Sequence, residues 1–257
     1  MCFYSRPEER KDSKVLLSLQ TKIIEMKKKA LIILIITLIS SPLLKGQNIQ
    51  VFYDFGKAVD KVNFSTKPTI RSTFEMFKPD AWGSTFYFVD MDYAKDGVNS
   101  AYYEIARQLQ FWEGPLAVQV EYNGGLNSSF KFNHNLLLGA TYNFSNEDFS
   151  KTFSLSALYK YIPENALKHT FQLTGVWNMN FLNDLLSFSG YIDYWREDKG
   201  YASDIIMTQP QFWLNLNKIN GINEGLNLSI GAEVDITHNF YSKGFFAIPA
   251  IGAKWSF

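Results

Sequence analysis

Apolar and polar residues alternate along much of the chain after residue 46. In the clearest run, 225–237, Leu, Ile, Ala and Val occupy the even positions, and polar residues or glycine occupy the odd ones. The segments 151–161 and 168–179 show largely the same period of two. This period places apolar side chains on one face of a β-strand and polar side chains on the other. The sequence therefore predicts strands with one apolar and one polar face.

Clusters of Gly, Asn, Asp, Pro and Lys separate twelve such segments. They lie at 50–56, 68–78, 83–92, 101–112, 115–123, 134–144, 150–161, 167–178, 184–195, 203–216, 225–237 and 245–257. Twelve is an even number, as in single-chain bacterial barrels with both ends in the periplasm. We therefore predict an all-β fold, a twelve-stranded antiparallel transmembrane β-barrel with short loops.

Placing both ends in the periplasm also assigns the connections. Asn123-Gly124-Gly125 and Asp96-Gly97 are expected to supply the positive φ angles that chain reversals need. The periplasmic turns would be 79–82, 113–114, 145–149, 179–183 and 217–224, and the outer loops 57–67, 93–100, 124–133, 162–166, 196–202 and 238–244. A soluble β-sandwich would explain strands and turns equally well. The last segment favours the barrel, because every second residue from Phe245 to Phe257 is apolar.

The composition agrees with a barrel. Aromatic residues make up 16% of the chain, with 22 Phe and 14 Tyr, although the mean hydropathy is only −0.13. No apolar run approaches the roughly 20 residues that a membrane-spanning helix requires. A barrel reconciles these facts, because it presents aromatic girdles to the membrane interfaces and polar side chains to its interior.

The N-terminal part of the chain predicts export. From Met26, three lysines precede the apolar stretch Ala30–Ile39, and a cut after Gly46 would follow. We interpret residues 1–25 as an upstream mis-start, 26–46 as a signal peptide and 47–257 as the outer-membrane β-barrel.

Charge and cysteine content narrow the function classes. Nine of the 25 Lys and Arg and four of the 25 Asp and Glu lie within residues 1–46, so the remainder carries 16 positive and 21 negative charges, about −5. This balance does not support binding to nucleic acid. The single cysteine, Cys2, precedes the signal, so neither a disulfide nor thiol chemistry is expected in the exported protein.

One stretch resembles a known family. Residues 75–92 read EMFKPDAWGSTFYFVDMD, and residues 103–107 read YEIAR. This stretch is similar to the nucleoside-specific channel-forming outer-membrane proteins (Tsx-like), in a divergent branch catalogued as a domain of unknown function. The resemblance implies a monomeric barrel through whose narrow lumen nucleosides diffuse passively. It identifies no individual binding residue.

The polar faces of the strands supply candidates for the lumen lining. Arg107 breaks the alternation, and we expect a β-bulge near Ala106 to turn it inward toward Glu104 or Glu121. Hydrogen-bonding and aromatic groups of this kind can line a selective pore or pair with one another to fill it. The candidate residues for the lumen and solute binding are Glu104, Arg107, Gln119, Glu121, Tyr191, Asp193, Gln211, Glu233, Asp235 and Lys254.

Two other function classes stay open. A sealed structural or adhesive barrel would have the same pattern with a closed lumen. A lipid hydrolase would need a serine beside a histidine, and none of His134, His169 and His238 begins a His-x-Ser pair. Separate placement of the histidines also argues against a zinc site, and we expect no enzyme activity, cofactor or metal. The expected partners are a small solute, outer-membrane lipid and, through Phe257, the barrel assembly machinery.

Overall fold

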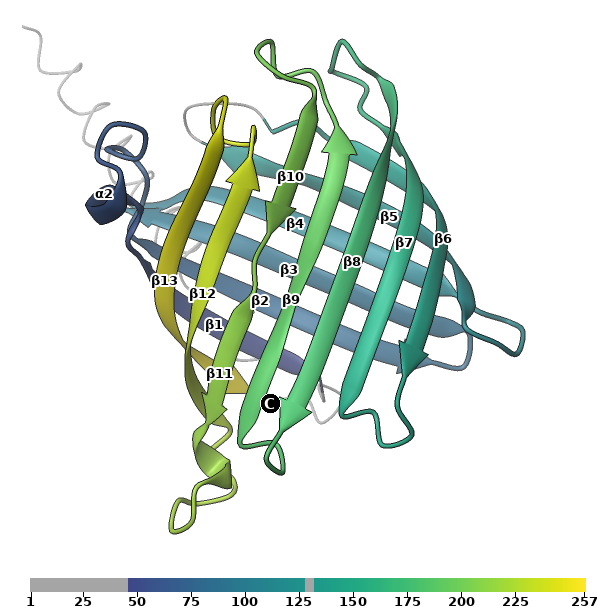
Figure 1. Ribbon diagram of the computed structural model, residues 1–257, viewed down its shortest axis with the longest axis vertical. Helices are drawn as coiled ribbons and strands as arrows, with labels where there is room; N and C mark the ends of the chain where they lie inside the picture. The colour runs from purple at the N-terminus through teal and green to yellow at the C-terminus, as the bar shows by residue number, and fades with distance from the viewer. Residues whose placement is uncertain (1–45, 128–131) are drawn as a thin grey trace, which may run out of the picture. The chain divides into compact units, whose positions relative to one another are not determined.

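The computed structural model describes residues 46–127 and 132–257. The expected upstream segment 1–25 and nearly all of the expected signal peptide 26–46 lie outside the described residues. The described part is almost entirely β-structure, with a short α-helix, α2, and a single 3-10 turn, η1 (Figure 1). Within this part, no helix has the length and apolar character needed to cross a bilayer.

The strands coincide closely with the predicted segments, and the first strand starts three residues earlier than expected. In chain order, the elements are β1 (Gln47–Asp54), α2 (Gly56–Val59), β2 (Ile70–Asp80), β3 (Gly83–Ala94), β4 (Gly97–Leu109), β5 (Leu116–Asn127), β6 (Asn135–Ser145), β7 (Lys151–Tyr161), β8 (His169–Phe181), β9 (Leu186–Arg196), β10 (Asp204–Thr208), β11 (Gln211–Asn215), η1 (Leu216–Lys218), β12 (Leu228–His238) and β13 (Phe245–Ser256).

Every strand pairs antiparallel with its neighbours, and the sheet closes on itself. β1 pairs with β2 on one side and with β13 on the other, so the first and last strands form the closing seam. β10 and β11 both lie between β9 and β12, and together they fill one position in the wall. The barrel therefore has twelve strand positions, which confirms the predicted fold class.

The division between β10 and β11 has a local cause. Pro210 has no N–H to donate to the ladder. Its carbonyl nevertheless accepts a bond from the N–H of Val234 at 3.1 Å, and the N–H of the preceding Gln209 bonds the carbonyl of Tyr191 at 3.2 Å. The wall thus continues across the interruption without opening.

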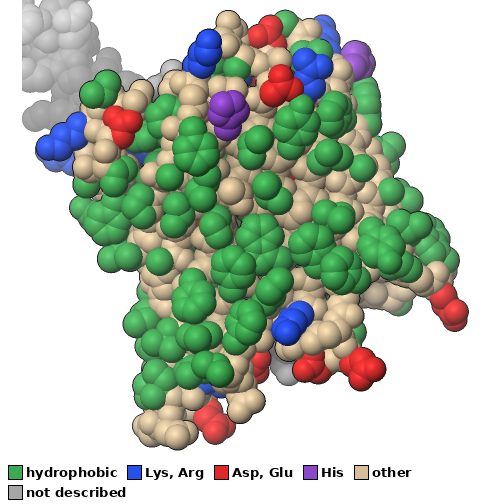
Figure 2. All heavy atoms as spheres, in the orientation of Figure 1, with side chains coloured by type: hydrophobic (Ala, Val, Ile, Leu, Met, Phe, Trp, Pro, Cys, Tyr) green, Lys and Arg blue, Asp and Glu red, His purple; other side chains and the backbone are tan. Residues whose placement is uncertain are grey.

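Alternation along the strands separates an apolar outer face from a polar inner one. Large apolar side chains stay exposed on the outside, among them Leu138 (54%), Leu155 (52%) and Ile251 (55%). Figure 2 shows such side chains over the middle of one wall, with the charged groups gathered toward the two ends. A band of this kind is the surface that a transmembrane barrel presents to lipid.

Two predicted outer loops are wrong. The connection expected at 93–100 is a tight turn, because β3 runs to Ala94 and β4 starts at Gly97, whose φ is +119° as predicted. The loop expected at 124–133 begins later, since β5 extends to Asn127. Gly124 and Gly125 are strand residues there. A Cβ on Gly125 would lie 2.6 Å from the Phe132 ring, so this glycine permits a close approach and makes no turn.

The remaining connections gather at the two ends of the barrel. We call the end at which Gly46 and Phe257 lie the terminal end and the opposite one the loop end; the C label and the β11–β12 connection mark the terminal end in Figure 1. The long β1–β2 loop folds over the loop end. Its Phe64, only 4% exposed, packs edge-on against Tyr241 and Phe246.

Candidate functional site

Contacts across the barrel show which side chains point inward. Two strands that are not neighbours in the wall can meet only through the interior. Arg71 of β2 forms an ion pair with Glu233 of β12, and Gln211 of β11 donates a hydrogen bond to Gln50 of β1 at 3.2 Å. These contacts fix the inner face of each strand, and the other inward residues follow from the alternation.

Nine of the ten predicted residues lie on this inner face. The alternation and register place them on six strands, β4, β5, β9, β11, β12 and β13. They are Glu104, Gln119, Glu121, Tyr191, Asp193, Gln211, Glu233, Asp235 and Lys254. These nine side chains thus point into the lumen, as predicted. Which solute they bind is proposed below.

Arg107 is the exception, and the predicted bulge is absent. β4 pairs with β3 and β5 without a register shift near Ala106, which is itself the inward residue and 7% exposed. Arg107 lies on the outer face near the terminal end. Its guanidinium donates to both carboxylate oxygens of Asp80, at 2.6 and 2.8 Å, and to Thr85 at 3.0 Å. An arginine can remain outside the barrel here because a bidentate partner at the rim balances its charge.

One cluster of inward charges surrounds Arg71. Besides the ion pair with Glu233, its guanidinium carbon lies 4.9 Å from the ring centre of Phe52. Gln211 donates to the second oxygen of Glu233 at 2.7 Å. Asp90 also lies close enough to act on the arginine charge. Paired charges of this kind fill that side of the interior.

A second cluster occupies the wall from β5 to β9. Glu121 accepts hydrogen bonds from Gln119 at 2.8 Å and from Asn123 at 3.2 Å. Lys160 donates to Gln172 at 2.8 Å, and its ammonium lies 4.8 Å from the ring centre of Trp195. Most of these groups are satisfied by neutral amides, so they form a hydrogen-bonded lining.

Four aromatic rings follow one another inside the barrel. Three belong to β3 and β4, and the fourth belongs to the connection between β5 and β6. Phe86 lies 5.8 Å from Phe88, Phe88 lies 5.9 Å from Tyr102, and Tyr102 lies 5.9 Å from Phe132, between ring centres. We call Phe86, Phe88, Tyr102 and Phe132 the aromatic ladder. The Tyr102 hydroxyl is 3.5 Å from the carboxylate of Glu104, one of the predicted residues. The ladder therefore combines flat apolar faces with polar groups.

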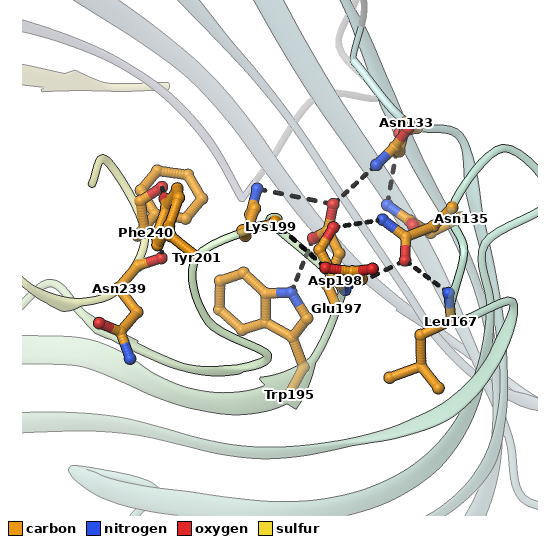
Figure 3. Close-up of polar contacts among 12 residues, drawn as sticks. Asn133, Asn135, Leu167, Trp195, Glu197, Asp198, Lys199, Tyr201, Asn239 and Phe240 are labelled. Atoms are coloured by element: carbon orange, nitrogen blue, oxygen red, sulfur yellow. Dashed lines mark hydrogen bonds and ion pairs between the residues drawn. The ribbon is translucent and has the colours of Figure 1, made fainter. Parts of the chain in front are cut away.

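The loop end is tied together around Glu197 of the β9–β10 loop, as Figure 3 shows. Its carboxylate accepts hydrogen bonds from the side-chain amide of Asn133 at 2.7 Å and from the indole of Trp195 at 3.0 Å, and the ammonium of Lys199 lies 3.5 Å away. Asn165 of the β7–β8 loop donates its side-chain amide to the carbonyl of Asp198 in the β9–β10 loop at 2.9 Å and accepts from the Asp198 N–H at 3.0 Å. Three connections are thus linked over this end.

The β9–β10 loop also contacts the β12–β13 connection. The Tyr201 hydroxyl donates to the carbonyls of Asn239 and Phe240 at 3.2 Å each, and Lys199 lies 5.4 Å from the ring centre of Phe240 (Figure 3). In that connection, burial and the neighbouring Asp235 raise the pKa of Tyr241 well above its ordinary value, so its hydroxyl stays a hydrogen-bond donor. Side-chain contacts thus link the described parts of four connections at the loop end, β5–β6, β7–β8, β9–β10 and β12–β13.

The terminal end is hollow by contrast. A cavity of about 270 Å³ opens there, and we call its lining residues the terminal vestibule: Asn178, Asn180, Ser187, Asn215, Asn217, Lys218, Asn227, Ser229, Lys254 and Ser256. Val176, which shares the inner face with Asn178, is 43% exposed. An inward side chain with that exposure indicates that accessible space reaches well into the barrel.

The sequence predicted which acidic residues point inward, but it did not predict the aromatic ladder or the hydrogen-bond network around Glu197. Phe86, Phe88 and Tyr102 share the inner parity of β3 and β4, and that signal could have placed them in the lumen. Phe132 and Glu197 lie in connections, where no period exists to orient them. The contacts that make the ladder and the loop-end network depend on strand register and on loop folding.

Comparisons with known proteins agree with this architecture. The NanC porin aligns with a TM-score of 0.52 at 8% identity, over 82% of this chain and 100% of that one. The KdgM porin gives 0.48 at 13% identity over 82% and 98%, and OccK5 of Pseudomonas aeruginosa gives 0.41 at 9% identity over 82% and 62%. At these identities, the likeness concerns the fold of outer-membrane porins alone.

A search of the curated proteins found no match. Residues 46–257 match the family described as Domain of unknown function (DUF5020), which spans the whole barrel. This finding agrees with the expected branch of unknown function and says nothing about nucleosides. The chain belongs to the DUF5020 family.

Proposed function

We propose that the protein is a passive channel for small solutes in the outer membrane of a Gram-negative cell. The closed wall has an apolar outer band and a polar inner face, which is the arrangement that a lipid bilayer requires of a spanning barrel. We place the terminal end toward the periplasm and the loop end toward the outside of the cell. The wall closes within one chain, so the barrel needs no second chain to complete it, and we propose that it acts as a monomer.

The observation that carries the proposal is the accessible space inside the wall. Beyond the terminal vestibule and Val176, several inward side chains at mid-height, Phe88, Tyr102 and Tyr191 among them, are only partly buried. A barrel filled to native packing density would bury them completely. The lining is therefore open to solvent, as a channel for small solutes requires.

Nucleosides are the solute class that this lining suits best. A nucleobase offers a flat face that can stack on the aromatic ladder, and ribose hydroxyls can hydrogen-bond to acids such as Glu104 and Asp193. The resemblance of residues 75–92 and 103–107 to nucleoside-specific channels supports the same choice. Each contact is weak, as passage requires.

Liposome swelling tests the proposal. Vesicles containing the folded protein should swell faster in nucleosides than in sugars or amino acids of equal size. Phe88→Leu and Tyr102→Leu should reduce the preference for nucleosides about two- to tenfold, the value of one or two ring contacts. Leu228→Ala, on the outer face, is the matched control. Equal swelling for all solutes would leave a general channel without nucleoside preference.

A specific observation favours a sealed barrel as the second candidate. Toward the loop end, several inward apolar side chains are almost fully buried: Leu137 (1%), Leu158 (2%), Ile205 (0%) and Ile248 (1%). Together with the Glu197 network, they narrow the lumen. Absence of swelling in every solute, with protein shown to be folded by its migration on unheated gels, would establish this alternative.

Lipid hydrolysis receives no support from the described histidines. His134 bonds the hydroxyl of Tyr122 at 2.7 Å, and His169 bonds that of Tyr159 at 2.5 Å. Neither ring contacts a serine hydroxyl in the described part of the chain, as a nucleophile and its base would require. We propose transport without catalysis.

A further inference from the structure

The terminal vestibule differs chemically from the rest of the barrel interior. Its ten lining residues comprise five asparagines, three serines and two lysines, and no acid. Elsewhere on the inner face, acids predominate, as at Glu104, Glu121 and Asp193. The vestibule is therefore rich in hydrogen-bonding groups. Lys218 is paired with Asp184 at 3.6 Å, so Lys254 supplies the unpaired positive charge of the lining.

Lys254 lies on the inner wall of this cavity, and no carboxylate among the described residues forms an ion pair with its ammonium group. Its ammonium is 4.5 Å from the ring centre of Trp213, which is fully buried beneath it. It makes no hydrogen bond or ion pair with any side chain in the described residues. Glu75 is near enough to act on its charge, but that carboxylate accepts bonds from Asn48 and Gln50, both at 3.3 Å. The three ammonium protons remain available.

Two asparagines that line the same cavity also have free amides. Asn178 and Asn180 of β8 point into the cavity, and their side chains make no hydrogen bond with other described residues. Asn215 of β11, in the wall between β8 and β13, is instead held in place, because it donates to Ser187 at 2.9 Å and accepts from Ser229 at 2.6 Å. The cavity thus has unused hydrogen-bonding groups on β8 and on β13, with fixed polar side chains in the wall between them.

We propose that the terminal vestibule binds a small, hydroxyl-rich solute that carries a carboxylate or phosphate group. The anionic group pairs with the Lys254 ammonium, and the amides of Asn178 and Asn180 hydrogen-bond to the hydroxyls. A cation with unused donors is worth most to an anion where the surroundings are partly dehydrated, as above the Trp213 ring. This site goes beyond the proposed passage of nucleosides, and its occupancy does not require the barrel to conduct.

Equilibrium binding to the folded protein in detergent micelles tests the inference directly. Isothermal titration calorimetry would compare glucose 6-phosphate, glucuronate, glucose and inorganic phosphate. We expect one or both sugar anions to bind at least about tenfold more tightly than glucose, and also more tightly than inorganic phosphate. The comparison of the two sugar anions identifies which anionic group the site prefers.

Variants locate the site. Lys254→Met keeps the aliphatic stem on Trp213 and removes the charge, and it should lower the affinity for the preferred sugar anion about tenfold or more. Asn178→Asp is isosteric at an exposed position and places a negative charge in the cavity, so it should do the same even if Lys254→Met fails to fold. Lys151→Met removes a lysine from the outer face at the same end and should change nothing.

Equal affinity for glucose and the sugar anions would overturn the inference, as would unchanged binding in Asn178→Asp. Inorganic phosphate binding as tightly as glucose 6-phosphate would also contradict it, because the amides would then contribute nothing. None of these outcomes depends on swelling, so a barrel that binds the sugar anion without conducting would refute the proposed channel alone.

Discussion

The ion pair between Arg71 and Glu233 allows a quantitative test of how the interior is held together. The two side chains are 11% and 3% exposed and join strands on opposite sides of the closing seam. Arg71→Met removes the positive charge and leaves Glu233 buried, with Asp90 and Asp235 close by. Removing one partner of a buried pair typically costs about 3 to 5 kcal/mol of stability, because the remaining charge has lost its compensation.

The assay is urea unfolding of the barrel in lipid vesicles, followed by tryptophan fluorescence and by migration on unheated gels. Arg71→Met should lower the free energy of unfolding by the amount given above. Adding Glu233→Gln should recover part of the loss, and the double-mutant cycle should give a coupling of roughly 0.5 to 3 kcal/mol. Arg107→Met is the control, since its pair with Asp80 is 27% and 45% exposed and lies on the outer face of the wall at the terminal end. An equal loss of stability in Arg71→Met and Arg107→Met would refute the reasoning.

Three further predictions concern assembly and the loop end. Gly231→Val should abolish barrel formation, measured as the folded band on unheated gels, because its side chain would clash with the carbonyl oxygen of Phe212 and the ring of Trp213. Ala232→Val on the outer face should fold normally. Glu197→Ala should release the loops that it ties, so trypsin should cleave after Lys199 faster than in the parent protein, and unchanged cleavage would show that the network is dispensable. Deleting the terminal Phe should prevent outer-membrane insertion, measured by fractionation, if assembly machinery recognises it; normal membrane levels would reject that role.

Sequence periodicity predicted the strands because the physical demand is the same along the whole barrel. Each spanning strand must face lipid with one side and a polar interior with the other, so apolar and polar residues alternate in its sequence. The segment 225–237 shows it without interruption, and β12 lies there. The predicted inward acids followed from the same rule.

The failures arose where a residue type serves two physical purposes. Glycine permits turns and also close packing, and at Gly125 the deciding neighbour, Phe132, cannot be recognised from composition. Arg107 violated the alternation, and a bulge was the local explanation. The actual explanation is the ion pair with Asp80. This residue is 27 positions away in the chain, and the β2–β3 and β3–β4 pairings bring it beside Arg107 at the terminal end. The loop-end network around Glu197 likewise depends on connections that have no periodic pattern.

The closing seam has a kinetic consequence for this protein. When β10 and β11 are counted as one position, every other pairing in the wall joins positions that follow each other along the chain. The seam instead joins Asn48 to Ser256, about two hundred residues apart. Loop-closure entropy makes such a contact slow to form, so it is the last pairing that folding can complete. Until then, β1 and β13 both expose unpaired backbone groups that another chain could use. The time between synthesis and seam formation is therefore the period in which this protein is most prone to aggregate.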